Sequence, residues 1–407
     1  MDGRPAAFAA LRHPRFGTLL ACGALAMMAD NVEHVVSYWV MFQEFRSPAL
    51  GGFAVVAHWL PFLLFSIPSG ALGDRVGPRR PIQIAMALFA CVSLTWAVLF
   101  LTHSVKLWHA VVLLVVHGLA GVLWGPLTQL LLHEVVGPQD LLSAVRLTAT
   151  SRYLGMLLGP AVGSGLLLAL GAPYALMLNA LIYAPLAIWL WRHTPAPLEA
   201  RPRASGFRDV VATLGRARLN PAIFALTALG AGAAFFVGNA YQAQMPQYAR
   251  DFGHGDPGIT YTMLLAADAA GALFAGIALE TVGLLTPRVR TAILLAAGWG
   301  ASLAAFALTR SYPLALALLF AAGFLELSFN SMAQALVQLE APAEWRGRMI
   351  GLYSMAAQGM RTFSGVTVGL AGAALGVHWS LAVSGACVVA LCGTLLAGAP
   401  RRTAAAA

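Results

Sequence analysis

The residues of this sequence best suited to chemistry are charged side chains inside long apolar segments. Asp30, Glu33 and His34 lie in the apolar segment 16–41, and their spacing places them on one face of a helix. Two close carboxylates repel each other and burial disfavours their charged forms, so we expect at least one to bind a proton near neutral pH. The pattern predicts proton handling, with a structural ion pair that never titrates as the alternative.

Two arginines also fall inside apolar segments. Arg152 lies in the segment 143–169 and Arg361 in the segment 347–374. A guanidinium group stays charged, so each arginine needs a carboxylate, a water-filled cavity or an anionic substrate beside it. Both are therefore candidates for contact with an acidic residue or with a negatively charged cargo.

Further polar side chains in apolar segments could line a cavity between helices. Asp268 and Glu326 are the acidic ones, and Asn330 follows Glu326 by four residues, which places the two on one helix face. The remaining cavity candidates are His34, His58, His117, Gln129, Asn239 and Gln242. Hydrogen bonding from helix to helix is the alternative for the histidines and amides.

The composition shows what solvent surrounds these residues. Of 407 residues, 59% are hydrophobic and 10% are charged, whereas an average soluble domain is about 25% charged. A helix that crosses a bilayer needs about 20 mostly apolar residues. Twelve such segments lie near 16–41, 50–72, 81–102, 107–132, 143–169, 172–192, 220–243, 259–280, 290–309, 313–338, 347–374 and 377–397. They lack the alternation of barrel strands, so we expect an all-α polytopic membrane protein.

The basic residues predict the orientation of the chain. Of 25 basic residues, 19 fall in loops on the side of the amino terminus and 4 on the opposite side. This bias places both termini in the cytoplasm, and we expect a bacterial inner-membrane protein. The net charge of +9 is then a signal of topology, and we expect no nucleic-acid partner. The four cysteines form no CxxC pair, and no cluster has metal-ligand spacing, so neither a disulfide nor a metal site is predicted.

The sequence also repeats itself. The segment GALGDRVG, residues 70–77, recurs in altered form as GIALETVG, residues 276–283, at an offset of 206 residues. We infer a duplication with one six-helix bundle over 1–192 and a second over 220–407. Between them, the linker 193–219 carries Phe207, Val210, Val211 and Leu214 at the spacing of an amphipathic helix on the membrane surface.

The motif GALGDRVGPRR resembles the signature of the major facilitator superfamily between spans 2 and 3. Its signature positions are held by Gly70, Asp74, Arg75, Gly77 and Arg79. The span 5 segment with Gly155, Gly159, Pro160 and Gly163 resembles the antiporter signature, although Ser164 stands where a glycine is usual. The stretches 125–148 and 336–355 are similar to the branch that includes the enterobactin exporter. One departure is that Leu114 stands where many proton antiporters carry an arginine.

This resemblance implies two pseudo-symmetric six-helix bundles with spans 1 and 5 as neighbours. Arg152 is then the preferred counter-ion for Asp30 or Glu33. The resemblance also implies that Asp74 docks near Arg348 at the cytoplasmic start of span 11 and latches one half against the other. Gly159 and Pro160 are expected to kink span 5 and limit proton leak, with a packing motif of no directional meaning as the alternative.

Together these features predict a proton-driven exporter of a small molecule, either a siderophore or a hydrophobic or anionic compound. A proton symporter that takes up a siderophore or nutrient is the alternative. An enzyme or a sensor is a remote third possibility, because no GxSxG elbow or P-loop is present. We expect a monomer in a lipid bilayer that needs a proton gradient and no cofactor.

Overall fold

The computed structural model describes residues 8–45, 48–193, 207–238, 240–253, 257–282, 285, 287–364, 367–368 and 375–398. Within these ranges the regular structure is helical, with no strand. The first half contains η1 Ala9–Arg12, α1 Phe16–Phe45, α2 Pro48–Val76, α3 Arg79–Leu101, α4 Leu107–Val136, α5 Leu141–Leu170, α6 Ala172–Ile182 and α7 Ala184–Arg192. The second half contains α8 Phe207–Leu219, α9 Pro221–Phe236, α10 Ala240–Asp251, α11 Pro257–Val282, α12 Val289–Leu308, α13 Tyr312–Glu340, η2 Ala343–Trp345, α14 Arg346–Ala357, η3 Gly359–Phe363 and α16 Val377–Gly398.

Ten of the described helices are long and apolar enough to cross a membrane, and an eleventh is reached if α8 and α9 are counted as one bent span. Two predicted segments, 220–243 and 347–374, contain no single described helix that is long enough to cross a membrane, because each is broken into shorter helices. The first separates into α9 and α10 near Gly238, which has a φ of +50°, and the second changes from α14 to the 3₁₀ helix η3 at Gln358. Hydropathy identifies these segments as apolar but does not record where the backbone ladder is interrupted.

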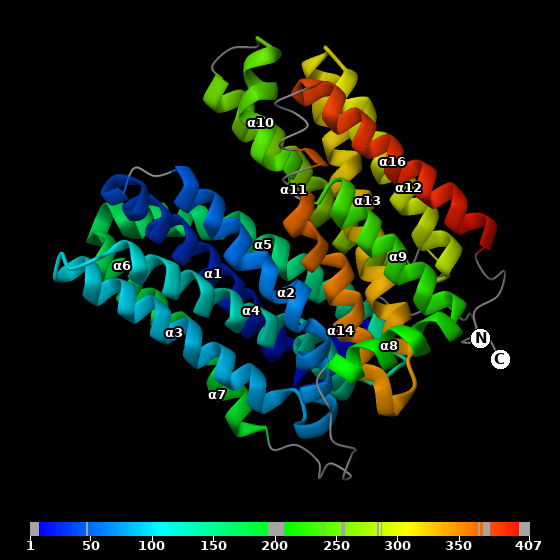
Figure 1. The fold of residues 1–407 in the computed structure, drawn as a ribbon, viewed down its shortest axis with the longest axis horizontal. Coiled ribbons are helices and arrows are strands. Elements are labelled where there is room, and N and C mark those ends of the chain that lie inside the picture. Colours follow the sequence, from blue (N-terminus) through cyan, green and yellow to red (C-terminus); the bar gives the residue numbers. More distant parts are fainter. Residues whose placement is uncertain are drawn as a thin grey trace.

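The helices form two bundles that lean against each other (Figure 1). In the first bundle α1 packs against α5 and α2 against α4; in the second α11 packs against α13 and α12 against α16. The bundles meet mainly where α2 contacts α14 and where α5 contacts α11 and α13. The fold is thus an all-α membrane architecture of two related six-helix halves, as the duplication predicts.

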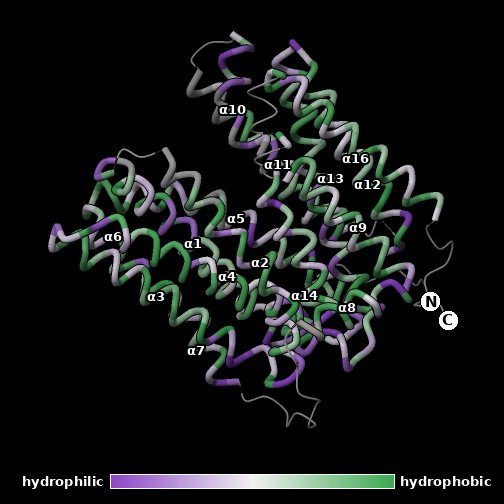
Figure 2. Tube along the Cα trace, viewed as in Figure 1, coloured by the Kyte–Doolittle hydropathy of each residue, from purple (hydrophilic) through white to green (hydrophobic). Residues whose placement is uncertain are grey.

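Hydrophobic residues predominate along the helices of both bundles (Figure 2), and many of their large side chains are exposed. Leu168 is 87% exposed and Trp191 is 79% exposed, although a monomeric soluble protein rarely leaves large contiguous apolar patches on its surface. In a bilayer these side chains contact lipid, whose tails offer no hydrogen bonds but accept apolar groups. The exterior therefore supports the membrane assignment independently of segment length.

Glycines set how closely the helices approach. A methyl group at Gly155 would lie 3.0 Å from the carbonyl oxygen of Ala24, and one at Gly163 would lie 3.2 Å from the Cα of Val32. At Gly159 it would clash with the side chain of Asn31. The span 5 motif is thus the surface on which α1 lies, which confirms that spans 1 and 5 are neighbours. The helix α5 continues through Pro160 from Leu141 to Leu170.

The linker contains the predicted short helix, α8, which meets α9 at an angle of 117°. Thr213 and Ala217 are buried against the protein, whereas Val211 and Leu214 are exposed. The side chain of Phe207 and residues 194–206 lie outside the described residues. The exposed apolar pair leaves one face of α8 free to lie in the membrane interface.

Candidate functional site

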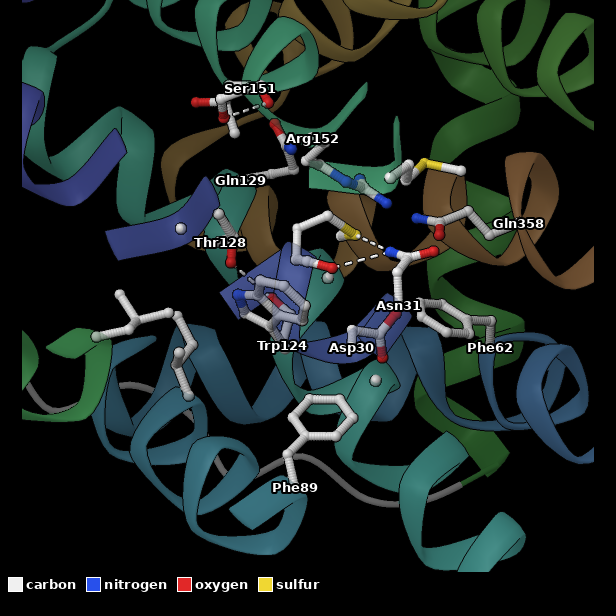
Figure 3. A pocket seen from close by; sticks show the side chains of 18 of the residues that line it. Asp30, Asn31, Phe62, Phe89, Trp124, Thr128, Gln129, Ser151, Arg152 and Gln358 are labelled. Atoms are coloured by element: carbon white, nitrogen blue, oxygen red, sulfur yellow. Dashed lines mark hydrogen bonds between the residues drawn. The ribbon is translucent and has the colours of Figure 1, made fainter. Parts of the chain in front are cut away.

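A cavity of about 360 Å³ lies mainly in the first half and is closed on one side by residues of the second half. Helices α1 to α5 and α7 supply most of its wall, whereas Gln358, between α14 and η3, and Arg361, within η3, come from the second half. Figure 3 shows Arg152 and Gln358 on one side of the cavity and Asp30 and Phe89 on the other. Arg152 and Gln358 are related by the 206-residue offset, so the two halves face each other here.

The carboxylates predicted in α1 are both bound by one histidine from α4. His117 Nε2 lies 2.9 Å from Asp30 Oδ1, and His117 Nδ1 lies 2.7 Å from Glu33 Oε1. All three side chains are buried, with exposed fractions of 8% for Asp30, 2% for Glu33 and 4% for His117. Of these two contacts only that of Nδ1 with Glu33 has hydrogen-bond geometry, whereas Nε2 faces Asp30 at ion-pair distance. His117 therefore lies between two acids and would attract both when its imidazole is protonated.

The two acids differ in their other contacts. Glu33 accepts a hydrogen bond from Ser93, whose hydroxyl in turn accepts one from Asn179 at 3.1 Å, so Glu33 is held against α3 and α6. Asp30 instead lines the cavity, with the His34 ring nitrogen 3.7 Å from its Oδ2. Asp30 is consequently the acid that a proton or a cargo can reach, and Glu33 positions His117.

The predicted pairing of Arg152 with Asp30 or Glu33 was wrong. Among the described residues Arg152 forms no ion pair or hydrogen bond, and it lines the cavity together with Arg361. The cation that serves the acids is His117, three residues after Leu114 and on the same side of α4. His117 lies one turn further along α4 than Leu114, the position at which the family resemblance implies an arginine.

Three histidines from three helices gather at this edge of the cavity. The ring nitrogens of His34, His58 and His117 lie within 4.8 Å of one another, close enough in principle to hold a metal ion. The sequence predicts no metal site, and its spacing could not reveal this group because each histidine is on a different helix. Both nitrogens of His117 already contact carboxylates, so ligation would require it to give up one of them. The geometry favours carboxylate pairing over metal binding.

The acids of the second half also lie together. Tyr241 Oη in α10 lies 3.1 Å from Asp268 Oδ2 and 3.5 Å from Glu326 Oε2. Gln242 Nε2 donates to Asp268 Oδ2 at 3.3 Å, and Arg361 lies 3.7 Å from Glu326 Oε1. The sequence identified four of these five residues one by one. Tyr241 was missed, since a tyrosine inside an apolar segment gives no signal distinct from packing.

Other predicted cavity residues have mixed positions. Gln129 lines the cavity and also accepts a hydrogen bond from Gln338 in α13 at 3.1 Å, which joins the two halves. Asn330 lines a small hollow with Glu326 and Arg361. Asn239 lies outside the described residues.

At the end of the bundles where α1 begins and α2 ends, which we call the basic face, Asp74 docks on the start of α14. Its carboxylate accepts hydrogen bonds from Gly347 N at 2.7 Å and from Arg348 N at 3.0 Å, and Arg348 Nη1 lies 3.4 Å from it. The positive end of a helix and an arginine both favour a carboxylate there. The predicted docking near Arg348 is confirmed.

The rest of the signature loop shapes this contact. The backbones of α2 and α14 touch at Gly70 and Gly347, where a β-carbon on either residue would clash. Gly77, with a φ of +79°, ends α2, and its N–H bonds to Gly73 O at 2.9 Å. Arg79 donates to the backbone carbonyl of His193 after α7, and Arg75 is exposed in the last turn of α2.

A second docking contact follows the duplication. Glu280, at the position in α11 that corresponds to Asp74, accepts a hydrogen bond from Ser143 Oγ at 2.6 Å and lies 3.9 Å from Arg146 Nη1. Arg146 also donates to Leu279 O at 3.2 Å. Both partners are in the first turns of α5, so each half docks the end of one helix on the start of a helix in the other. The repeat revealed the equivalence of Asp74 and Glu280 but not these partners.

Comparisons with known proteins agree with this architecture. The family model described as Major Facilitator Superfamily matches residues 19–365. A search of curated proteins finds no match. Among solved structures, the human organic anion transporter MFSD10 (TETRAN) is similar with a TM-score of 0.73 and 13% identity, and the match covers 93% of this chain and 99% of that one.

Two further solved structures show the same fold. The E. coli fucose:proton symporter FucP gives a TM-score of 0.71 at 14% identity, with 95% of this chain and 98% of that one covered. A bacterial homologue of the iron transporter ferroportin in an outward-facing state gives 0.73 at 16% identity, with 94% and 99% covered. At these identities the likeness concerns the arrangement of helices.

Proposed function

The chain belongs to the major facilitator superfamily, and from this premise we propose that it is a proton-coupled secondary transporter that exports a small anionic molecule. It is a membrane transporter by family and fold, and not an enzyme. The observation that carries the finer proposal is the central cavity, where an unpaired Arg152 faces the Asp30–His117–Glu33 cluster.

The cavity suits a cargo with both an acidic group and an aromatic or apolar body. Arg152 has no counter-ion among the described residues, so an anionic group would satisfy it. Phe62, Phe89 and Trp124 line the same space and offer ring faces for an apolar body. A siderophore combines these features, in keeping with the sequence stretches that resemble siderophore exporters.

In a proton-driven exporter, the inward-moving proton and the outward-moving cargo must not occupy the binding site at the same time. A cargo hydroxyl or amine that donates a hydrogen bond to Asp30 binds more strongly while that carboxylate is ionised, because a protonated carboxyl group is a weaker acceptor. A proton that arrives from outside would occupy the same oxygen and release the cargo. Glu33 and His117 would remain paired during this exchange, and this pair would hold the imidazole in place beside Asp30.

Alternating access would require the contacts at the basic face to form and separate in turn. In this structure the Asp74–α14 and Glu280–α5 contacts and the Gln129–Gln338 hydrogen bond hold the halves together there. Cargo could enter from that side only after these contacts separate. We propose that the basic face is cytoplasmic, since the loop arginines gather there, and that the protein acts as a monomer in the bacterial inner membrane without a cofactor.

Uptake by proton symport is the second candidate, and it is favoured by the presence of both Arg152 and Asp30 in the wall of the cavity. If the cargo contacts Arg152 alone, protonation of Asp30 removes a negative charge from the cavity wall and strengthens the binding of an anion. Proton and anion would then travel together. The two candidates differ only in whether the cargo also occupies Asp30.

The test is transport in proteoliposomes with an imposed pH gradient, using a catecholate such as 2,3-dihydroxybenzoate and a panel of other organic anions. Export predicts that cargo moves against the proton flux, whereas symport predicts movement with it. Arg152→Gln should abolish either, while Arg310→Gln, outside the cavity, serves as the matched control. Equal transport by the Arg152→Gln variant would contradict the proposed cargo site.

A further inference from the structure

The second half contains a buried group of acids that the proposed cargo exchange does not use. Asp268 is 4% exposed and Glu326 is 7% exposed. The helices that carry them cross in close contact, since a β-carbon on Gly323 would clash with the backbone carbonyl of Asp268. This crossing holds the two carboxyl groups on either side of one tyrosine hydroxyl.

The number of hydrogens available to these groups is too small for two ionised acids. Tyr241 Oη lies within 3.5 Å of both carboxyl groups but has a single hydrogen to donate. Gln242 donates to the oxygen of Asp268 that already faces the tyrosine, and Asp268 Oδ1 is buried without a partner among the described residues. A proton on one carboxyl group supplies the missing donor.

The charges lead to the same result. The charged and titratable groups that face the pair are Tyr241 from α10, Tyr153 from α5 and Arg361 from η3. Arg152 from α5 and Tyr353 from α14 lie near Arg361 instead. Of the other helices that pack on the pair, α9 has no titratable residue, α12 has only Arg290 in its first turn, and α4 contacts α13 through amides. Arg361 is thus the only cation paired with the two acids among the described residues.

We propose that Asp268 and Glu326 form a second proton-binding site, in which the two carboxyl groups share one proton across Tyr241. With one proton, the two acids and Arg361 are electrically neutral, whereas two ionised acids would leave an uncompensated charge in the membrane interior. The proton belongs to the pair and not to either residue alone.

Arg361 connects this site to the cavity. It lies 3.7 Å from Glu326, its guanidinium stacks 5.2 Å from the ring centre of Trp59 in the first half, and it lines the cargo cavity. An anionic cargo at Arg361 would neutralise the cation that faces Glu326, so the pair would hold its proton more firmly. The site is a property of the second half and stands whether or not the cargo and direction proposed above are correct.

Infrared difference spectroscopy of the purified full-length protein, titrated with acid and base, tests the site without any cargo. The carbonyl stretch of a protonated carboxyl group, identified by its shift in D₂O, should be present at neutral pH in the unmodified protein. Asp268→Asn and Glu326→Gln should each remove it, because the charge of Arg361 balances the one remaining acid, which then ionises. Arg361→Gln should enlarge it, because without the cation both acids retain a proton.

The control variants are Asp251→Asn and Glu344→Gln, which replace exposed acids of the same half and should leave the band unchanged. Thermal unfolding of each variant confirms that it is folded. A band that disappears in Asp268→Asn but persists in Glu326→Gln would reveal a lone protonated aspartate and overturn the shared site. Absence of any protonated carboxyl signal at neutral pH would overturn it as well, whereas failure of the transport assay would bear only on the proposed function.

Discussion

The two halves share a backbone plan but handle buried acids by different means. In the first half Asp30 and Glu33 face the imidazole of His117; in the second, Asp268 and Glu326 face a tyrosine, an amide and the guanidinium of Arg361. The positions do not correspond, because the 206-residue offset places Phe62 opposite Asp268 and Phe236 opposite Asp30.

The docking contacts at the basic face behave in the opposite way. Asp74 and Glu280 occupy equivalent positions and each docks on the start of a helix in the other half. The duplication thus preserved the parts that join the halves, while the membrane interior diverged. This difference indicates that the docking contacts have the same role in both halves, whereas the buried acids of the two halves have different roles.

Removal of His117 should break the first half most severely. His117→Leu would leave two buried carboxylates without their cation, and loss of one partner of a buried ion pair costs about 3–5 kcal/mol of folding free energy. The defect should shrink as the pH falls, because protonation of Asp30 and Glu33 removes their charge. Thermal unfolding in detergent at neutral and acidic pH measures it. His58→Leu, which removes an imidazole with no carboxylate partner, is the matched control, and an equal loss in both variants would contradict the pairing.

Replacement of the accessible acid should separate proton coupling from cargo movement. Asp30→Asn is expected to abolish transport driven by a pH gradient while exchange of cargo between the two sides continues, since the amide cannot bind a proton. Flux assays with and without a gradient measure the two activities. Asp140→Asn, at the surface beside His13, is the control. Full gradient-driven transport by both Asp30→Asn and Glu33→Gln would remove the proposed mechanism.

The two cavity arginines should contribute unequally to the binding of an anion. Arg152→Gln should weaken it by about 1.5–3 kcal/mol, or roughly 10- to 150-fold, the range for hydrogen bonds to charged groups. Arg361→Gln should weaken it less, because Glu326 already offsets that charge. Equilibrium binding of 2,3-dihydroxybenzoate and related anions compares the two. A larger loss in Arg361→Gln would reverse the assignment of the cargo contact.

Weakening of the basic face should produce the smallest effects. Asp74→Asn loses an ionised acceptor of two backbone donors and an arginine, at a cost of about 1–3 kcal/mol, so the closed basic face should be less populated and transport slower. Glu280→Gln should have a smaller effect, because its arginine is 3.9 Å away. Solvent accessibility of a fluorophore at this face reports the opening, and membrane insertion should be unchanged. Normal transport by Asp74→Asn would contradict a latch.

The sequence was informative where a signal is local. Segment length and composition predicted the apolar helices, and the resemblance of the signature loop to that of the major facilitator superfamily implied the contact of Asp74 with the start of α14. The glycine spacing of α5 predicted a close neighbour, because small residues permit close approach whatever lies opposite.

The pairing of charges could not be predicted in this way. It depends on how each helix is rotated and how deep each residue lies, which a one-dimensional pattern does not contain. Arg152 was a reasonable partner for Asp30 by helix adjacency, yet the imidazole of His117, 84 residues from Glu33 in the chain, reaches both acids from another helix. The break at Gln358 was invisible for a related reason, since an apolar segment looks the same whether or not its backbone ladder is continuous.

The stacking of Arg361 on Trp59 has an electrical consequence. The guanidinium contacts a ring of the first half and an acid of its own half at the same time, so rocking of the halves must separate it from one of them and shift its positive charge. When a charge moves within the low-dielectric interior of a membrane, a compensating charge flows in the external circuit. Membranes packed with this protein should therefore give a transient current when the halves change position, even when nothing is transported.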